Sequence, residues 1–214
     1  MDFNRKNINA IKYGFHFKCL YILIDGFRLM KADGKYELNW EEEQLTATLI
    51  HYIKGCPNRN KWKIHIEPEI RNYTHQIIDG SKTPKTASRI DMKLFTWQND
   101  NEDIFMIEAK NIRENNWINK NGKLNYARRL HIRFIETGIE HIISGHYPLN
   151  SCICGYILEG KEKNILEKLN KILKEKRINN LYKSDPINNH LMIYNTNLDS
   201  ETKIKHIFLS FNMN

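Results

Sequence analysis

Three residues in the middle of the chain have the types and the spacing for metal-dependent hydrolysis. Glu108 and Lys110 are two residues apart in the apolar run 103–112, which is typical of a β-strand. Because side chains alternate between the two faces of a strand, Glu108 and Lys110 share a face. Asp91 lies in the preceding strand-like run, 89–97, and a short polar turn joins the two runs into a hairpin. The sequence therefore predicts two carboxylates and one ammonium group side by side.

Such a cluster supplies what phosphodiester hydrolysis needs. Carboxylate oxygens hold Mg²⁺ through few protein ligands, and the ion polarises the phosphate and lowers the pKa of a bound water. We expect Asp91 and Glu108 to be ligands, together with the main-chain carbonyl of Ala109. Lys110 is then expected to orient the attacking water or help to deprotonate it. Mg²⁺ is the predicted cofactor, and Mn²⁺ is expected to substitute for it.

The same residues also allow a purely structural interpretation. Glu108 and Lys110 would then form a solvated strand face, and Asp91 would mark the entrance of a strand. Both strands are otherwise very apolar, however, so a charged triad projecting from them is less expected on structural grounds alone. We therefore favour the catalytic interpretation.

The pattern resembles the PD-(D/E)xK, or restriction-endonuclease-like, nuclease superfamily. In that superfamily a metal-binding Asp ends one strand, and a (D/E)xK triplet, here Glu108-Ala109-Lys110, lies on the next. The resemblance covers residues 39–160 and implies a mixed sheet flanked by helices. It departs from the pattern at Ile90, which stands where the motif has its proline.

A glutamate on the helix before the hairpin often completes the metal site in this family. The segment 39–53 predicts such a helix, because Asn39 can cap it and three glutamates favour its first turn. Glu42 precedes Leu45 by three residues, which places it near the buried stripe of the helix. Glu43 points away from this stripe, so we expect Glu42, and not Glu43, to be a further ligand and catalytic residue. The alternative is that Glu42 only stabilises the helix, through the favourable interaction of a first-turn glutamate with the helix dipole.

The remaining chain alternates between helical and extended patterns. Hydrophobic periodicity predicts further helices over 8–31, 124–144 and 161–176, and further strands over 62–70, 151–158, 190–195 and 203–211. Gly138 is a weak point of the helix 124–144. The polar segment 73–88 is expected to be a long loop.

This order of elements predicts an α/β fold with a mixed central sheet and helices on its faces. The resemblance makes it restriction-endonuclease-like, with an extra N-terminal helical segment. We expect residues 1–38 to form this extension and residues 39–214 to form one compact nuclease-like domain.

An excess of basic residues is consistent with a polyanionic partner. Lys and Arg number 33 against 25 Asp and Glu, which gives a formal net charge of +8. The predicted helix 124–144 carries Arg128, Arg129 and Arg133, and Lys120 lies in the loop before it. These side chains could grip phosphates, and the alternative is an exposed basic face without a ligand.

Other chemistry is less well supported by the sequence. The four cysteines have no CxxC spacing, and the nine histidines form no HxH or HExxH motif, so we expect no zinc site and no disulfide framework. The sequence has no signal-type segment and no apolar run long enough to span a bilayer, which favours a cytoplasmic protein.

Together these features predict a Mg²⁺-dependent endonuclease that acts on DNA, resembling restriction or phage-defence nucleases. The segment 8–31 is more aromatic than one covering helix needs, so we expect it to support a homodimer. Two alternatives stay open: a catalytically silent nucleic-acid-binding module, and a non-enzymatic subunit of a defence complex.

Overall fold

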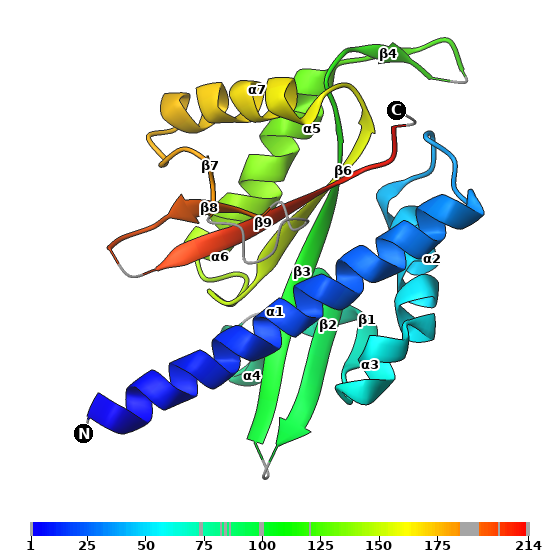
Figure 1. Cartoon of the computed structure of the whole chain (residues 1–214). Coiled ribbons are helices and arrows are strands. Elements are labelled where there is room, and N and C mark those ends of the chain that lie inside the picture. The colour runs from blue at the N-terminus through cyan, green and yellow to red at the C-terminus, as the bar shows by residue number, and fades with distance from the viewer. Residues whose placement is uncertain are drawn as a thin grey trace.

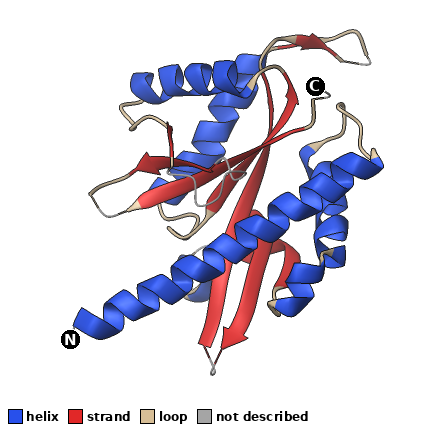
Figure 2. Cartoon of the chain, viewed as in Figure 1, coloured by secondary structure: helices blue, strands red, loops and turns tan. Residues whose placement is uncertain are grey.

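A central β-sheet lies between two layers of helices in the computed structural model (Figures 1 and 2). The structure describes residues 2–72, 75–81, 83, 85, 87–98, 101–119, 121–184, 193–200 and 202–212. Within these ranges the side chains of residues 2–13, 72, 75, 76, 88 and 98 are left out of the description.

Helices and strands alternate along much of the chain. The helices are α1 (Asp2–Asp33), α2 (Glu42–Gly55), α3 (Pro57–Lys61), α4 (His75–Ile78), α5 (Ala127–Phe134), the π-helical η2 (Ile135–Ile139), α6 (Glu140–Ile143) and α7 (Glu162–Glu175). The strands are β1 (His65–Asn72), β2 (Ser88–Gln98), β3 (Asn101–Arg113), β4 (Trp117–Ile118), β5 (Leu124–Asn125), β6 (Cys152–Glu159), β7 (Tyr182–Lys183), β8 (Ile193–Asn197) and β9 (Lys203–Ser210).

In the described part of the chain, seven strands form the main sheet in the order β1-β2-β3-β6-β9-β8-β7. The central strands β3, β6 and β9 are parallel, and the outer strands pair antiparallel. Parallel neighbours need crossover connections, and α5 to α6 and α7 lie in these crossovers. The predicted mixed α/β architecture with helices on the faces of its sheet is confirmed. β4 and β5 form a separate two-stranded ribbon.

Two hydrophobic clusters, one on each face of the sheet, make up the core. α1 and α2 pack on one face, where strand β3 contributes Phe105, Ile107 and Ala109. The helices α5, η2, α6 and α7 pack on the other face, where β3 contributes Ile112. Strand β3 thus has helices on both sides, and its alternate residues belong to different clusters.

The N-terminal helix α1, predicted as an extension of the nuclease-like domain, contributes to the same core as α2 and the sheet. Phe15 is buried, and the ring of Phe27 packs edge-on against Phe211 with 5.0 Å between the centroids. A Cβ at Gly26 would lie 2.5 Å from Cγ1 and 3.0 Å from the backbone nitrogen of Ile53. Gly26 therefore allows α1 and α2 to approach closely. These aromatic side chains pack within the chain itself.

Helix boundaries differ from the sequence expectations in three places. α1 spans Asp2–Asp33, where the sequence predicted a helix over 8–31. α2 begins at Glu42, and its N-cap is Glu41 without a side-chain capping bond, so the predicted capping role of Asn39 is wrong. The predicted helix 124–144 is interrupted: β5 occupies its start, and five residues around Gly138 are π-helical. A Cβ at Gly138 would lie 3.2 Å from the side chain of Ile153, which shows how closely η2 approaches strand β6.

Two short helices were not predicted. α3 follows α2 directly and begins with Pro57, a residue that suits the first turn of a helix. α4 lies within the segment 73–88, which was expected to be only a loop. None of the helices in the described residues, the 32-residue α1 included, combines the length and apolar character needed to cross a membrane.

The packing around strand β6 gives a test of the fold. A Cβ at Gly155 would lie 2.6 Å from the ring of Phe208, so Gly155→Ala should destabilise the protein by about 1–3 kcal/mol through overpacking. Urea denaturation measures this change. Gly14→Ala in α1 is the control, because its Cβ would meet no atom within 4 Å. That variant should match or exceed the wild type, by up to about 1 kcal/mol. Equal stability of all three proteins would contradict this packing.

Candidate active site

The site forms where strand β2 separates from strand β3. The hydrogen-bonded register of this hairpin ends at the pair Met92 and Ile107. Beyond it, the Asp91 carboxylate takes the place of the missing strand, because its Oδ2 accepts a bond of 2.6 Å from the Ala109 N–H. The register between β1 and β2 also skips Glu69 and Asp91, and Glu69 has a φ of 48°. A local irregularity in two strands therefore directs Asp91 toward β3.

Two residues further along β3, the Glu42 carboxylate likewise accepts a backbone hydrogen bond that a carbonyl of a paired strand would otherwise accept. Its Oε2 accepts a bond of 2.9 Å from the Asn111 N–H, and the Asn111 side chain donates to the Trp40 carbonyl at 3.1 Å. Alternate N–H groups of a strand point to the same side, so Ala109 and Asn111 present their donors to the gap left by β2. Glu42 is 9% exposed, whereas Glu43 is fully on the exposed side of α2. The structure thus places Glu42, and not Glu43, at the site.

Lys110 occupies the centre of the cluster. Its Nζ donates to Glu108 Oε1, to the Ala109 carbonyl at 2.9 Å and to Glu42 Oε1 at 3.4 Å. Glu108 and Lys110 are only 5% and 3% exposed. All four predicted side chains, from α2, β2 and β3, are therefore brought together. The solvated strand face of the structural alternative is not observed, because both β3 side chains are buried.

Arg133 is one of the predicted basic residues, and it reaches this cluster from α5. One Nη of Arg133 lies 3.1 Å from Glu42 Oε1, and its side chain is 55% exposed. Arg128 instead pairs with Glu175 at the surface, and Arg129 stacks on the ring of Tyr126. Lys120 lies outside the described residues.

Burial and charge set the protonation of the cluster. Asp91, Glu42 and Glu108 face two cations, Lys110 and Arg133, which leaves one carboxylate without a compensating charge. Burial raises the pKa of Glu108 to about 7 against the opposing effect of Lys110. Burial also raises the pKa of Asp91, although the Ala109 N–H and Lys110 counteract it.

The donor set fits a hard divalent cation. All its donors are oxygen atoms, which Mg²⁺ prefers, and the buried Oε2 of Glu108 has no hydrogen-bond partner. In the described part of the chain, no three His, Cys, Asp or Glu side chains are arranged as they stand to hold a metal ion. The Lys110 ammonium instead contacts three of the four predicted ligand groups. The positive charge that lies between these oxygens is therefore the ammonium group of Lys110.

Two further polar residues beside the cluster were not predicted as site residues. Tyr147 is 4% exposed and donates to the Arg89 carbonyl at 3.0 Å. Burial raises the pKa of the Tyr147 hydroxyl most, and the nearby negative charge of Glu108 raises it further. The His141 ring packs edge-on against Tyr147 and stacks on His146. Their sequence spacing gives no signal of this arrangement, because the loop after α6 brings them together.

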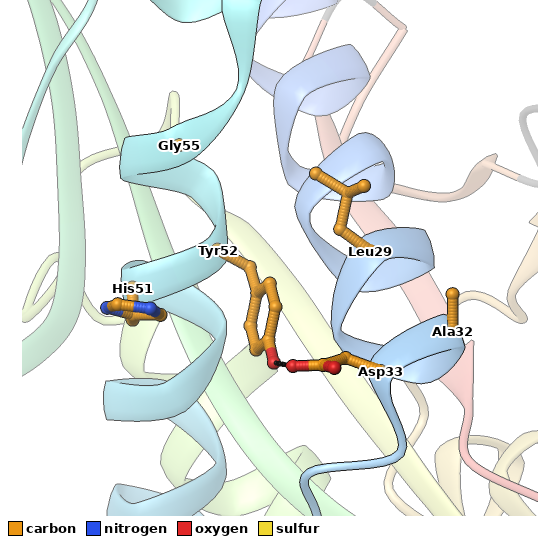
Figure 3. A pocket seen from close by; sticks show the side chains of 6 residues that line it. All are labelled: Leu29, Ala32, Asp33, His51, Tyr52 and Gly55. Carbon is orange, nitrogen blue, oxygen red and sulfur yellow. Dashed lines mark hydrogen bonds between the residues drawn. The ribbon is translucent and has the colours of Figure 1, made fainter.

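A shallow hollow on the surface is separate from this cluster. It lies between the C-terminal turns of α1 and α2, where the Tyr52 hydroxyl donates to the Asp33 carboxylate (Figure 3). Glu42, in contrast, lies in the first turn of α2. The hollow is lined by Leu29, Ala32, Asp33, His51, Tyr52 and Gly55. It contains none of the residues of the candidate site.

The raised pKa of Glu108 predicts how stability depends on pH when no divalent ion is present. A folded pKa of about 7 against an ordinary value of 4.5 means that the folded state binds this proton more tightly. The resulting stabilisation is complete below pH 4.5 and is lost as the pH rises through about 7. Relative to Glu108→Gln, the free energy of unfolding should therefore fall by up to about 3 kcal/mol over this range.

Urea denaturation in EDTA at several pH values measures this difference. Glu43→Gln removes the same charge from the exposed side of α2, and it should leave the wild-type pH profile unchanged. Parallel pH profiles for the wild type and Glu108→Gln would show that the Glu108 pKa is ordinary.

Comparisons with known proteins do not identify a family for this chain. The chain matches no protein-family model, no curated protein and no solved structure. The cluster around Lys110 is therefore the feature from which a function can be inferred.

Proposed function

We propose that this protein is a Mg²⁺-dependent endonuclease that hydrolyses phosphodiester bonds in DNA, with a restriction-endonuclease-like fold. One observation carries the proposal: three carboxylates from α2, β2 and β3 converge around the buried ammonium of Lys110. The (D/E)xK spacing, the upstream Asp and the upstream helical Glu all contribute to this one cluster.

A stabilising role alone explains the cluster poorly. Buried ion pairs seldom stabilise a fold more than apolar residues of similar size, because desolvation offsets their attraction. Here one carboxylate lacks a compensating charge, and the buried Oε2 of Glu108 has no hydrogen-bond partner. Buried groups with perturbed pKa values that gather in this way are typical of functional sites.

The protein oxygens supply a binding site for the metal ion. Asp91, Glu108 and the Ala109 carbonyl would hold Mg²⁺, and Glu42 would complete the set. Asp91 and Glu42 each keep one oxygen on a β3 N–H, which fixes their carboxylates before the metal binds. When bound, Mg²⁺ supplies Lewis acidity and positive charge at the scissile phosphate.

Lys110 and Arg133 have separate roles in this proposal. With a divalent ion held by the carboxylates, Lys110 would no longer be needed to balance their charge, and its ammonium could orient the attacking water and move a proton. Arg133 has further N–H donors besides the one on Glu42, and its half-exposed guanidinium can bind a neighbouring phosphate.

DNA is the proposed substrate because the chain carries a net charge of +8, which favours a polyanion. A restriction or phage-defence role in the cytoplasm, and a homodimer that cuts both strands, belong to the same proposal. The contacts of Phe15 and Phe27 within their own chain reduce the support that α1 gives to a dimer.

Cleavage of supercoiled plasmid tests the site directly. With Mg²⁺ or Mn²⁺ the wild type should nick or linearise the plasmid, and Lys110→Ala and Asp91→Ala should reduce the rate by roughly 100-fold or more. Lys93→Ala is the matched control, because Lys93 is a β2 lysine paired with Glu102 at 2.8 Å outside the cluster. Unchanged cleavage by Lys110→Ala would refute the assignment. Tight DNA binding without cleavage by any protein would favour a binding module.

The phosphate-binding role of Arg133 gives a second prediction. Arg133→Ala should lower kcat/KM by about tenfold or more, because one charge-assisted contact to the substrate is lost. Arg128→Ala removes an arginine from the same helix that is paired with Glu175, so its kcat/KM should stay near the wild-type value. Steady-state cleavage of a labelled duplex measures both values, and equal losses would assign the effect to net charge alone.

A further inference from the structure

The ribbon β4–β5, with its turn at residues 119 and 121–123, connects the two elements that carry the site. It begins shortly after Lys110 on strand β3 and leads into α5, which carries Arg133. In Figure 1 it extends away from the body of the molecule, beyond the end of β3. Whatever the ribbon contacts will therefore be held at a fixed position relative to the cluster.

Local hydrogen bonds give the ribbon a defined shape. Trp117 pairs with Asn125, and Ile118 pairs with Leu124. The Asn119 side chain accepts from the N–H groups of residues 121 and 123 at 3.1 and 2.9 Å, which closes the turn. At the base, Asn116 accepts from the Ala127 N–H at 3.0 Å and joins the ribbon to the start of α5. The ribbon is therefore preformed before it meets a partner.

Apolar side chains are exposed on this ribbon. Ile118 is 70% exposed and Leu124 is 47% exposed. They are cross-strand partners, so both project from the same face. Tyr126, at the end of the ribbon, is also 47% exposed. An ordered structure that presents such a pair to water has the character of an interaction surface.

The charge around the ribbon is strongly positive. Residues 113–133 contain six Lys and Arg but only one acid, Glu114. Glu114 is occupied within the chain, because its carboxylate accepts from the Lys161 N–H at 2.7 Å and from Asn164 at 2.8 Å. Lys123 and Arg129 are exposed. The complementary partner is therefore an anion that also offers apolar surface.

We propose that the β4–β5 ribbon enters the major groove of duplex DNA and positions the duplex for cleavage, an inference that rests on the nuclease function proposed above. The major groove of B-DNA admits a two-stranded ribbon, and the Ile118 and Leu124 side chains can contact base edges such as the thymine methyl group. Lys123 and Arg129 lie on the same ribbon and the adjoining helix, where they bind phosphates. The deep, narrow major groove of duplex RNA excludes such a ribbon, so the ribbon selects DNA.

Fluorescence anisotropy of a labelled duplex in EDTA tests this proposal, because binding is then measured without cleavage. The double variant Ile118→Thr with Leu124→Thr keeps residues that favour strands but removes the apolar contacts. It should weaken binding to duplex DNA by roughly tenfold or more. Trp97→Thr is the matched control: Trp97 is 61% exposed on the hairpin at the opposite end of β3, and this variant should bind like the wild type.

Salt dependence provides an independent readout on the charges. Replacing Lys123 and Arg129 with glutamine should lower the slope of log affinity against log salt by about 2, because each phosphate contact contributes roughly 0.9. An unchanged slope would remove these two side chains from the interface and overturn their part of the proposal.

The outcomes separate this proposal from the nuclease function. Wild-type affinity in the threonine double variant, or equal affinity of the wild type for duplex RNA and DNA, would overturn the ribbon proposal. The proposal would also be overturned if sedimentation showed that the threonine double variant loses self-association but keeps DNA binding, because the partner of the ribbon would then be a second copy of the chain. If the ribbon variant loses DNA binding but the wild type cleaves no plasmid with Mg²⁺ or Mn²⁺, the ribbon is a DNA-binding element, and the nuclease proposal fails together with the role of the ribbon in positioning DNA for cleavage.

Discussion

The separation of strand β2 from strand β3 is the constraint on which the candidate site depends. Beyond Ile107, β3 has lost one hydrogen-bonding neighbour, and buried N–H groups without partners are costly. The carboxylates of Asp91 and Glu42 replace the missing backbone acceptors at Ala109 and Asn111. Two acidic side chains are thereby required for the strand itself, and the same bonds hold them next to Glu108 and Lys110.

Strand β3 contributes to both the core and the site, because one of its faces packs against helices and the other carries the charged residues. Phe105, Ile107 and Ala109 pack under α1 and α2. Glu108 and Lys110, on the alternate positions, carry the charges. The hydrophobic layer on one face thus holds the strand rigidly while the other face presents buried polar groups. Parallel neighbours on the β6 side keep the strand in the middle of the sheet.

The buried charges of the cluster reduce the stability of the fold, but they also give the site its capacity for chemistry. Glu108 is deeply buried, and its raised pKa reflects the free energy needed to ionise it there. Lys110 offsets part of this cost by contacting Glu42, Glu108 and the Ala109 carbonyl. The extensive apolar packing of α1, α2 and the sheet allows the fold to tolerate the remainder. Such a trade is physically expected of the proposed site, whose role would be to bind a divalent cation and a polyanion.

Features that depend on local periodicity could be predicted from the amino-acid sequence. Strand alternation placed Glu108 and Lys110 on one face, the helical stripe selected Glu42 over Glu43, and the order of elements predicted a mixed sheet with helices on both faces. Local patterns cannot show which distant segments meet, so those contacts became known only from the folded structure. It brought Arg133 onto Glu42 and Tyr147 beside Glu108, and it broke the predicted helix 124–144 at η2, where Gly138 packs against Ile153. The physical reason is that these contacts depend on the sheet order and the crossovers, which join residues far apart in the chain.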